Sequence, residues 1–408
     1  MRLHPFRALR PAPDLAARVG APPYDVVSRG EAAALVRGNE SSFLRIGRAE
    51  IDLPDDVDPY DPRVYARARE NLDRLIARGA LVQEGSPSLY VYREELGGRA
   101  QLGVVGCVHV DDYERDVIRK HERTRPDKED DRTRHILAVG AHAEPVLFAH
   151  RGRPAIDRLT DAAMAAPPLC EFAGVDGVRH TVWRAPGTDT LVEAFQAVPC
   201  AYVADGHHRT ASALRAARER RAANPAHRGD EEYNWFPAVL CPADRLQILP
   251  YNRVVRDLGG QSPSEVLERL AALGRLTPAR AAAPSRAGAF CFYLERRWHL
   301  LELAPESIDR GDPVRSLDVW LLQERVLEPV LGIADQRTDK RIDFVGGIRG
   351  TRALEARVDS GEDALAISMF PTSMEQLMAV ADAGAIMPPK STWFEPKLLS
   401  GLFVHSLD

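Results

Sequence analysis

The stretch VPCAYVADGHHRTASALRAARERR, residues 198–221, decides the fold class of this chain. Its apolar run over residues 200–204 is typical of a short buried strand, and Asp205 with Gly206 is a turn signal. The Ala- and Arg-rich residues that follow predict a helix. A strand, a tight turn and a helix in this order indicate an α/β protein.

Further elements are expected on both sides of this stretch. Apolar residues recur at helical spacing over residues 60–81, and acidic residues occupy the first turn of a second expected helix over 127–139. Two β-rich runs at 88–96 and 101–110 predict a hairpin through Gly97 and Gly98. Later strands are expected at 234–241, 245–255, 289–303 (a hairpin) and 364–370, and later helices at 263–276, 317–332 and 373–384. The expected fold class is therefore α/β, with a mixed α+β sheet.

The length of 408 residues indicates two domains, at about 100 to 200 residues per domain. An Ala-, Pro- and Arg-rich segment within residues 259–286 is typical of a linker or a domain boundary. We therefore expect one domain over residues 1–258 and a C-terminal α+β domain over residues 259–408.

Composition and charge limit the classes of function. The balance of 54 Lys and Arg against 59 Asp and Glu gives a net charge of -5, which argues against a general nucleic-acid binder. The N-terminus, MRLHPFRALRPAPDLAARV, carries charges and prolines where a signal peptide has an apolar run. There is also no run of about 18 apolar residues that could cross a membrane. We expect a cytoplasmic protein without a membrane or nucleic-acid partner.

The turn after the expected strand over residues 200–204 is a candidate anion site. A helix N-terminus exposes backbone amides there, and its dipole favours phosphate. Gly206 permits close backbone approach, while His207, His208 and Arg209 add donors. Asp205 could hold Mg²⁺, orient a histidine or act as a base. The alternative is that Asp205 caps the helix and that the histidines are packed or surface residues.

A second group of polar residues, VIRKHERTRPDKEDDRTRH, spans residues 117–135. Several hydrogen-bond donors lie close in sequence to one potential base, Glu122. Such a group would suit a substrate that carries both an anionic group and a hydroxyl. The alternative is a solvated helix face in which Asp131 and His135 form an i, i+4 pair.

Metal motifs are weak in this sequence. The five cysteines are odd in number, far apart and never in a CxxC pair, so we expect reduced, buried thiols. His121 and Glu122 begin like HExxH, but the position four after His121 is Arg125. His207 and the residue after it lack the i, i+4 spacing that places two ligands on one helix face. The sequence therefore does not favour a transition-metal site.

Two glycine-containing segments fail as nucleotide motifs. From Gly384 the chain approaches GxxxxGKS, but Pro389 stands at the second glycine, and proline lacks the amide donor. Four residues of this rigid loop could still reach a ligand: Lys390, Ser391, Thr392 and Lys397. The run VGGIRG, residues 345–350, lacks the GxGxxG spacing and predicts a turn.

Near the N-terminus, the segment APPYDVVSRGEAAAL places prolines before a helix start. Ser28 is positioned to cap that helix. Tyr24 or Asp25 could face a pocket, because prolines hold the loop rigid, although capping alone explains Ser28.

The motifs LHPFRALRP, APPYDVVS, SFLRI, KHERTRPDKEDDR, ADGHHR, YNRVV and MPPKSTWFEPKLLSGLFVH together resemble the prokaryotic domain-of-unknown-function family numbered ten-fifteen, over nearly the whole chain. The KHE-type segment followed by a DGHHR turn is also similar, more distantly, to the ParB and sulfiredoxin superfamily, and most closely to its free serine kinases. This second resemblance implies a ParB/sulfiredoxin-like nucleotide-binding core with large elaborations within residues 1–258. It also implies phosphate binding at the DGHHR turn and a catalytic base at Glu122. The long separation between Glu122 and Asp205 departs from the compact kinase domain.

Together, residues and resemblance predict a Mg²⁺-dependent phosphotransferase that moves phosphate from ATP or ADP to the hydroxyl of serine or a similar small metabolite. The predicted catalytic residues are Glu122, Asp205, which is also the predicted metal ligand, and His208. The predicted phosphate-binding residues are Gly206, His207, His208, Arg209 and Thr210. The predicted substrate-binding residues are His121, Arg123, Thr124, Arg125 and Lys390.

Two alternatives remain open at this point. One is a ParB-like nucleotide-binding switch with slow hydrolysis, read by a protein partner. The other is a small-molecule phosphate hydrolase that uses the same pocket. In each case the partners are a nucleotide and a small molecule, and a homodimer is left open.

Overall fold

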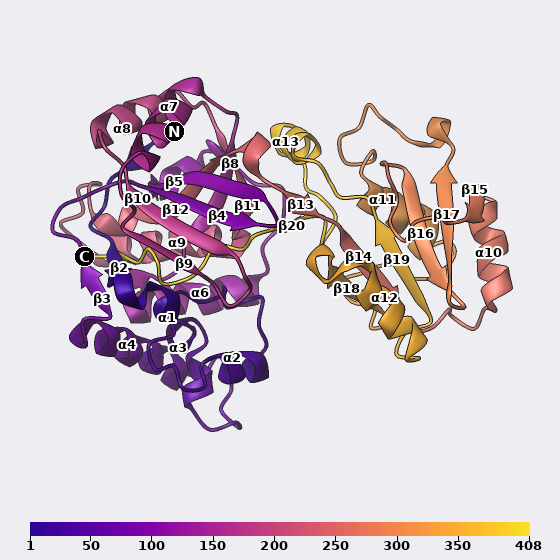
Figure 1. The fold of residues 1–408 in the computed structure, drawn as a ribbon, viewed down its shortest axis with the longest axis horizontal. Coiled ribbons are helices and arrows are strands. Elements are labelled where there is room, and N and C mark those ends of the chain that lie inside the picture. Colours follow the sequence, from indigo (N-terminus) through magenta and orange to yellow (C-terminus); the bar gives the residue numbers. More distant parts are fainter. The chain divides into compact units, whose positions relative to one another are not determined.

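The computed structural model describes residues 1–408, which divide into two compact units (Figure 1). The first unit consists of Met1–Leu246 and Pro396–Asp408, and the second of Gln247–Glu395. The expected boundary after residue 258 differs from this division at two places. The strand β14 (Tyr251–Val255) already belongs to the sheet of the second unit, and the C-terminal segment returns to the first.

The first unit is built around a nine-stranded mixed sheet in the order β6-β11-β8-β12-β5-β4-β10-β9, with β1 paired to β5. Two pairs, β11 with β6 and β12 with β8, are parallel, and the other pairs are antiparallel. The strands are β1 (Leu3–His4), β4 (Tyr90–Leu96), β5 (Arg99–His109), β6 (Ile118–Arg119), β8 (Val146–His150), β9 (Cys170–Ala173), β10 (Arg179–Arg184), β11 (Ala201–Asp205) and β12 (Trp235–Pro242). The expected mixed α/β fold class is confirmed.

The hairpin predicted from the sequence is the pair β4 and β5. Its turn residues Gly97 and Gly98 have φ angles of +57° and +80°, a region that glycine enters without the cost of a Cβ atom. β5 is buried along most of its length because strands cover both of its edges. The hairpin thereby forms the centre of the sheet.

Helices cover the sheet of the first unit and enclose two large apolar cores, besides a small cluster around Tyr233. The first core joins the sheet to α5, α7, α8 and α9, and the second lies among α2, α3, α4 and the end of α6. Figure 1 shows α7 and α8 on one side of the sheet and α3 and α4 on the other. The helices are α1 (Ala16–Val19), α2 (Arg29–Leu35), α3 (Leu44–Gly47), α4 (Pro62–Ala77), α5 (Val110–Glu114), α6 (Pro126–Val139), α7 (Pro154–Met164), α8 (Thr188–Gln196) and α9 (His207–Ala223). Two short ladders complete the unit: β2 (Leu9–Pro11) with β3 (Leu81–Gln83), and β7 (Ala141–His142) with β21 (His405–Ser406).

The helix α6 begins at Pro126 and ends before Gly140, whose φ of +69° closes it. One alternative for this helix, a solvated face carrying Asp131 and His135, is wrong, because both side chains are buried. Asp131 accepts a hydrogen bond from the Tyr65 hydroxyl at 2.9 Å, and His135 contacts the Ile46 carbonyl oxygen at 2.9 Å. α6 lies between α4 and α9, so its polar side chains are used inside the protein.

The second unit contains a six-stranded antiparallel sheet in the order β15-β17-β16-β19-β14-β18. The region 259–286, where a linker or domain boundary was expected, lies within this unit and contains the expected helix, α10 (Pro263–Ala271), and an edge strand, β15 (Gly274–Pro278). The predicted single strand over residues 245–255 is divided at Pro250, since proline has no amide for a ladder. The remaining elements are β13 (Ile248–Leu249), β15 (Gly274–Pro278), β16 (Ala289–Leu294), β17 (Arg297–Leu303), β18 (Ile342–Gly346), β19 (Leu365–Met369), β20 (Trp393–Phe394), α10 (Pro263–Ala271), α11 (Asp318–Leu322), α12 (Gly350–Asp359) and α13 (Met374–Asp382).

The prediction that the cysteines form no disulfide bonds is confirmed. All five cysteines are free, and four of them are buried, while Cys170 is half-buried. No helix in the structure has both the length and the apolar character needed to span a bilayer.

Candidate functional site

The turn between β11 and α9 has a backbone that only glycine adopts easily. Gly206 has a φ of +99° and forms the N-cap of α9. A Cβ atom at this position would lie 3.0 Å from Val146 Cγ1 and 3.1 Å from Arg209 Cζ. No side chain caps the helix, so the alternative in which Asp205 acts as the cap is wrong. The first-turn amides of α9, which have no acceptor within the helix, are therefore left for another group.

The two motifs that the sequence singled out meet at this turn. The rings of His121 and His207 pack edge to face, with centroids 4.4 Å apart. The backbone amide of Arg125 donates to His208 Nε2 at 3.1 Å. Glu122 lies in the same cluster, because its carboxylate and the two packed imidazoles offer ligand atoms within 4.8 Å of one another. Residues 121–125 and 205–209 thus form one site.

Asp205 is held by two cations. Its Oδ2 atom lies 3.4 Å from Arg209 Nη2 and 3.5 Å from Lys397 Nζ. Burial opposes the charge on Asp205, but these cations outweigh it and lower the pKa of its carboxyl to about 2. Lys397, for which the sequence suggested only a general ligand role, is therefore part of the site. The side chain of Asp205 remains 28% exposed, so a ligand can reach it.

Arg209 faces the protein's own acceptors. It is buried, it donates to the Pro145 carbonyl oxygen, and its Nε atom lies 4.0 Å from Glu144 Oε2. Burial opposes its charge, yet Asp205 and nearby carboxylates raise its pKa. In this geometry Arg209 orients the turn, and its direct contact with phosphate stays a prediction.

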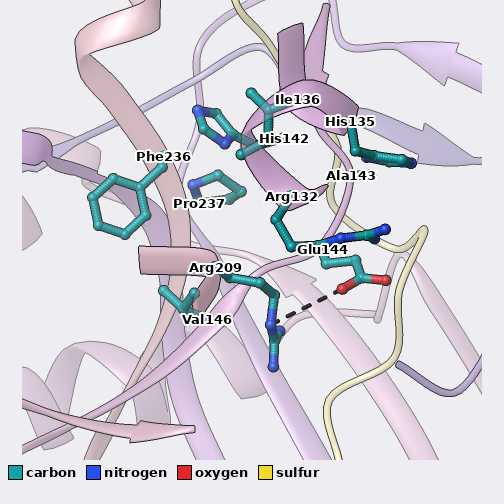
Figure 2. Close-up of a pocket in the computed structure, with 10 residues that line it drawn as sticks. All are labelled: Arg132, His135, Ile136, His142, Ala143, Glu144, Val146, Arg209, Phe236 and Pro237. Atoms are coloured by element: carbon teal, nitrogen blue, oxygen red, sulfur yellow. Dashed lines mark ion pairs between the residues drawn. The ribbon is translucent and has the colours of Figure 1, made fainter. Parts of the chain in front are cut away.

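The sequence analysis missed Glu144. Figure 2 shows it beside Arg132 and Arg209 at a cavity of about 30 Å³. Burial raises the pKa of Glu144, while the two arginines oppose that shift. A cavity of this size holds about one or two waters and no nucleotide. The only sequence signal was a carboxylate placed directly before the buried strand β8.

Residues near the N-terminus also take part. Tyr24 is buried, and the Arg132 guanidinium lies 4.1 Å from its ring centroid. Asp25 is exposed, yet its charge acts on both Arg209 and His208. These contacts place the Tyr24–Asp25 segment beside the turn. The predicted cap is confirmed too, since Ser28 and Glu31 form a capping box on α2.

Burial favours the neutral form of the histidines at this turn. Burial lowers the pKa of His121 to about 4 against the opposing effects of the Val203 carbonyl and Asp205. Burial and the neighbouring His121 hold the pKa of His207 well below its usual value. The pKa of His208 is lowered by burial as well, which suits its role as acceptor of the Arg125 amide. These side chains can donate hydrogen bonds to an anion but do not neutralise its charge.

Other predicted site residues have partners within the protein. The Thr210 hydroxyl donates to the Gly206 carbonyl oxygen at 3.0 Å, which stabilises the turn. Thr124 donates to Glu129, and Arg125 pairs with the side chain of Asp127 at 2.8 Å. Arg123 is exposed. Lys390 belongs to the second unit, where its Nζ lies 5.5 Å from the ring centroid of Tyr251. Its predicted contact with the substrate stays a prediction.

Comparison with known proteins confirms the family resemblance. The model of the family described as "Protein of unknown function (DUF1015)" matches residues 3–320. No curated protein matches the chain. Among solved structures, a conserved hypothetical protein from Pyrococcus furiosus is 16% identical, over 74% of this chain and 94% of that chain, with a TM-score of 0.36. A free serine kinase in complex with AMP is 13% identical, over 73% and 90% of the two chains, with a TM-score of 0.35. SbnI with C-terminal truncation from Staphylococcus aureus is 14% identical, over 74% and 87%, with a TM-score of 0.39.

Proposed function

The chain belongs to the DUF1015 family, and from this premise we propose that its first unit is a nucleotide-dependent phosphotransferase. The acceptor in this proposal is the hydroxyl of serine or of a similar small metabolite, and the donor is ATP or ADP. The proposal concerns the site at the N-terminus of α9.

One observation carries the proposal: the segment 121–125 and the turn 205–209 meet, although they are far apart in the sequence. The His121 and His207 rings are in contact, and the Arg125 amide binds His208. A carboxylate that can accept a proton, Glu122, then lies next to a helix N-terminus that can hold a phosphate. Phosphoryl transfer needs this combination, because positioning and charge stabilisation supply most of the catalysis.

The proposed step is a direct transfer. The acceptor hydroxyl oxygen forms a bond to the terminal phosphorus of the nucleotide, and the bond from that phosphorus to its bridging oxygen breaks. The hydroxyl proton passes to Glu122, and the shortened nucleotide leaves. The amides of the first turn of α9, close to Gly206, hold the transferred phosphate, with the neutral His207 and His208 as further donors. Arg123 and Arg125 hold the carboxylate of an amino-acid acceptor.

Mg²⁺ fits this site only as a companion of the nucleotide. Asp205 already shares one oxygen, Oδ2, with two cations, so its carboxylate does not form an oxygen cage by itself. The other oxygen, Oδ1, is the atom that we propose for contact with an ion held by the phosphates. The chemistry supplied by such an ion is neutralisation of phosphate charge. Lys397 keeps Asp205 ionised and oriented.

The test is to incubate the full-length protein with ATP or ADP, Mg²⁺ and a panel of amino acids, and to look for a phosphorylated product. Glu122→Gln should lower kcat by about 10²- to 10⁴-fold, as expected for loss of a general base. The Kd for the nucleotide should change by no more than a few-fold. The glutamine side chain cannot accept the proton, but it has nearly the same size as the glutamate side chain that it replaces.

Other outcomes discriminate the alternatives. Nucleotide binding without product, unchanged in Glu122→Ala, contradicts the kinase and favours a switch. Release of free phosphate in the absence of an acceptor, at a rate that no amino acid changes, favours a hydrolase. No nucleotide binding at all removes the proposal.

A further inference from the structure

The contact between the two motifs offers a second kind of chemistry. His121, Glu122 and His207 each present one ligand atom, and these atoms lie within 4.8 Å of one another. The three residues come from two distant segments of the chain. A search for metal-binding spacing along the sequence therefore tests only His121 with Arg125, or His207 with His208, and misses this cluster.

The histidines in this cluster have nitrogen atoms without partners. Both ring nitrogens of His121 and Nε2 of His207 are buried and have no partner at hydrogen-bond geometry, although the Val203 carbonyl lies near His121. The imidazoles are 1% and 7% exposed, so bulk water does not replace the missing bonds. A buried polar atom without a hydrogen-bond partner lowers the stability of the folded protein. Most buried polar atoms in native proteins therefore have such a partner. The edge-to-face packing of the two rings, at an interplanar angle of 89°, does not supply a hydrogen bond.

We propose that His121, Glu122 and His207 bind a divalent transition-metal ion of the Zn²⁺ class. Two imidazoles and one carboxylate form a donor set that suits such an ion, whereas Mg²⁺ requires oxygen ligands. Three protein ligands leave the fourth tetrahedral position open for water or for an oxygen of a bound molecule. This composition is typical of a catalytic zinc site rather than a closed structural one.

The present geometry is close to that of a zinc site. Ligands at about 2.0–2.1 Å from a tetrahedral ion lie about 3.4 Å from one another. The observed atoms, within 4.8 Å, would close that difference by small side-chain rotations. Glu122 is only half-buried, which leaves an approach for the ion from solvent.

Metal binding at this cluster goes beyond the proposed phosphotransfer. The affinity for the metal is measured in the absence of a nucleotide. Glu122 takes part in both, so a bound ion would compete with the acceptor proton for its carboxylate. Occupancy by metal and formation of phosphorylated product are separate readouts, and either can fail while the other holds.

The experiment uses the full chain, freed of metal by dialysis against a chelator. Zn²⁺ is added in competition with a chromophoric chelator, and Co²⁺ is added separately as a spectroscopic probe. We expect one tight equivalent of Zn²⁺ and a visible Co²⁺ spectrum typical of four-coordinate ligation. Glu122→Gln and His207→Asn should each weaken Zn²⁺ binding by at least about 100-fold, since even the outer residues of metal sites contribute about 10- to 100-fold.

The matched control is His227→Ala. His227 lies 2.8 Å from Glu231 in the same unit, but it belongs to no such cluster, so its loss should leave Zn²⁺ affinity unchanged. Circular dichroism of each variant checks that it folds. Of the two variants, Glu122→Gln should disturb folding less, because the side chain of Glu122 is only half-buried.

Two results would overturn the proposal. Less than a tenth of an equivalent of bound Zn²⁺ in the wild-type protein would mean that the two histidines are only a packed neutral pair. Tight binding that persists in both folded variants would assign the ion to other residues.

Discussion

The substitution Gly206→Ala tests whether the turn before α9 depends on glycine. Two costs add at this position. A residue other than glycine held at a φ of +99° costs about 1–3 kcal/mol in backbone strain. The new Cβ would also lie 3.0 Å from Val146 and 3.1 Å from Arg209. Both side chains are buried, so relieving that contact costs a further amount of about 1–3 kcal/mol.

Gly229→Ala is the matched control for this substitution. Gly229 has a φ of +102°, and a Cβ there would meet no atom within 4 Å. It therefore carries the backbone cost without the contact cost. The difference between the two variants, about 1–3 kcal/mol, isolates the packing of Gly206 against its neighbours.

The assay is urea unfolding followed by circular dichroism, with the transitions of the two units fitted separately. Nucleotide affinity is measured on the same samples, and it should fall only in Gly206→Ala, because its strain displaces the first-turn amides of α9. Equal destabilisation of the two variants, within about 0.5 kcal/mol, would refute the packing argument. Unchanged nucleotide affinity in a destabilised Gly206→Ala would refute the phosphate assignment.

Three further predictions concern stability. Between pH 6.5 and about 4 the unfolded chain binds more protons than the native protein, so the free energy of unfolding should fall as the pH falls. Each buried histidine contributes up to about 1.4 kcal/mol per pH unit to this fall. An unchanged free energy of unfolding between pH 7 and pH 5 contradicts the prediction. The buried histidines whose pKa falls to about 4 or to about 3 are His109, His121, His135, His142 and His180. Ser28→Ala removes the capping box of α2 and should cost about 1 kcal/mol in urea unfolding, without changing nucleotide affinity. Arg209→Lys should cost about 1–3 kcal/mol, because one ammonium cannot serve the Pro145 carbonyl and Asp205 together, and an unchanged unfolding midpoint would count against that role.

Local patterns predicted the elements around the candidate site and the central hairpin, whereas no element between residues 141 and 196 was predicted. The strand, turn and helix around Gly206, the hairpin β4–β5 and the helix α6 each follow from residues that are neighbours in the sequence. The division into units was harder to predict, because the region of the expected boundary also contains a helix and an edge strand that belong to the second unit. The return of the C-terminal segment to the first unit has no local signal at all.

The site was predictable as two motifs but not as a geometry. Residue types singled out Glu122 and Asp205 as candidates, but their spacing along the chain gave no distance between them. Glu144 stood alone in the sequence, and only the fold places it beside Arg209. The burial of Asp131 also depends on tertiary structure, because its partner Tyr65 comes from α4.

The charges around the N-terminus of α9 nearly cancel, and this decides how a nucleotide would bind there. Lys397 and Arg209 already face Asp205, Arg125 pairs with Asp127, and burial favours the neutral form of His121 and His207. The helix dipole adds only about half a positive charge. In the proposed reaction a nucleotide with several negative charges would therefore bring its own cation, and the ligand that we propose is its complex with Mg²⁺. The same reasoning separates the two proposed metals: an ion that prefers oxygen would arrive with the phosphates, and one that prefers nitrogen would bind between His121 and His207.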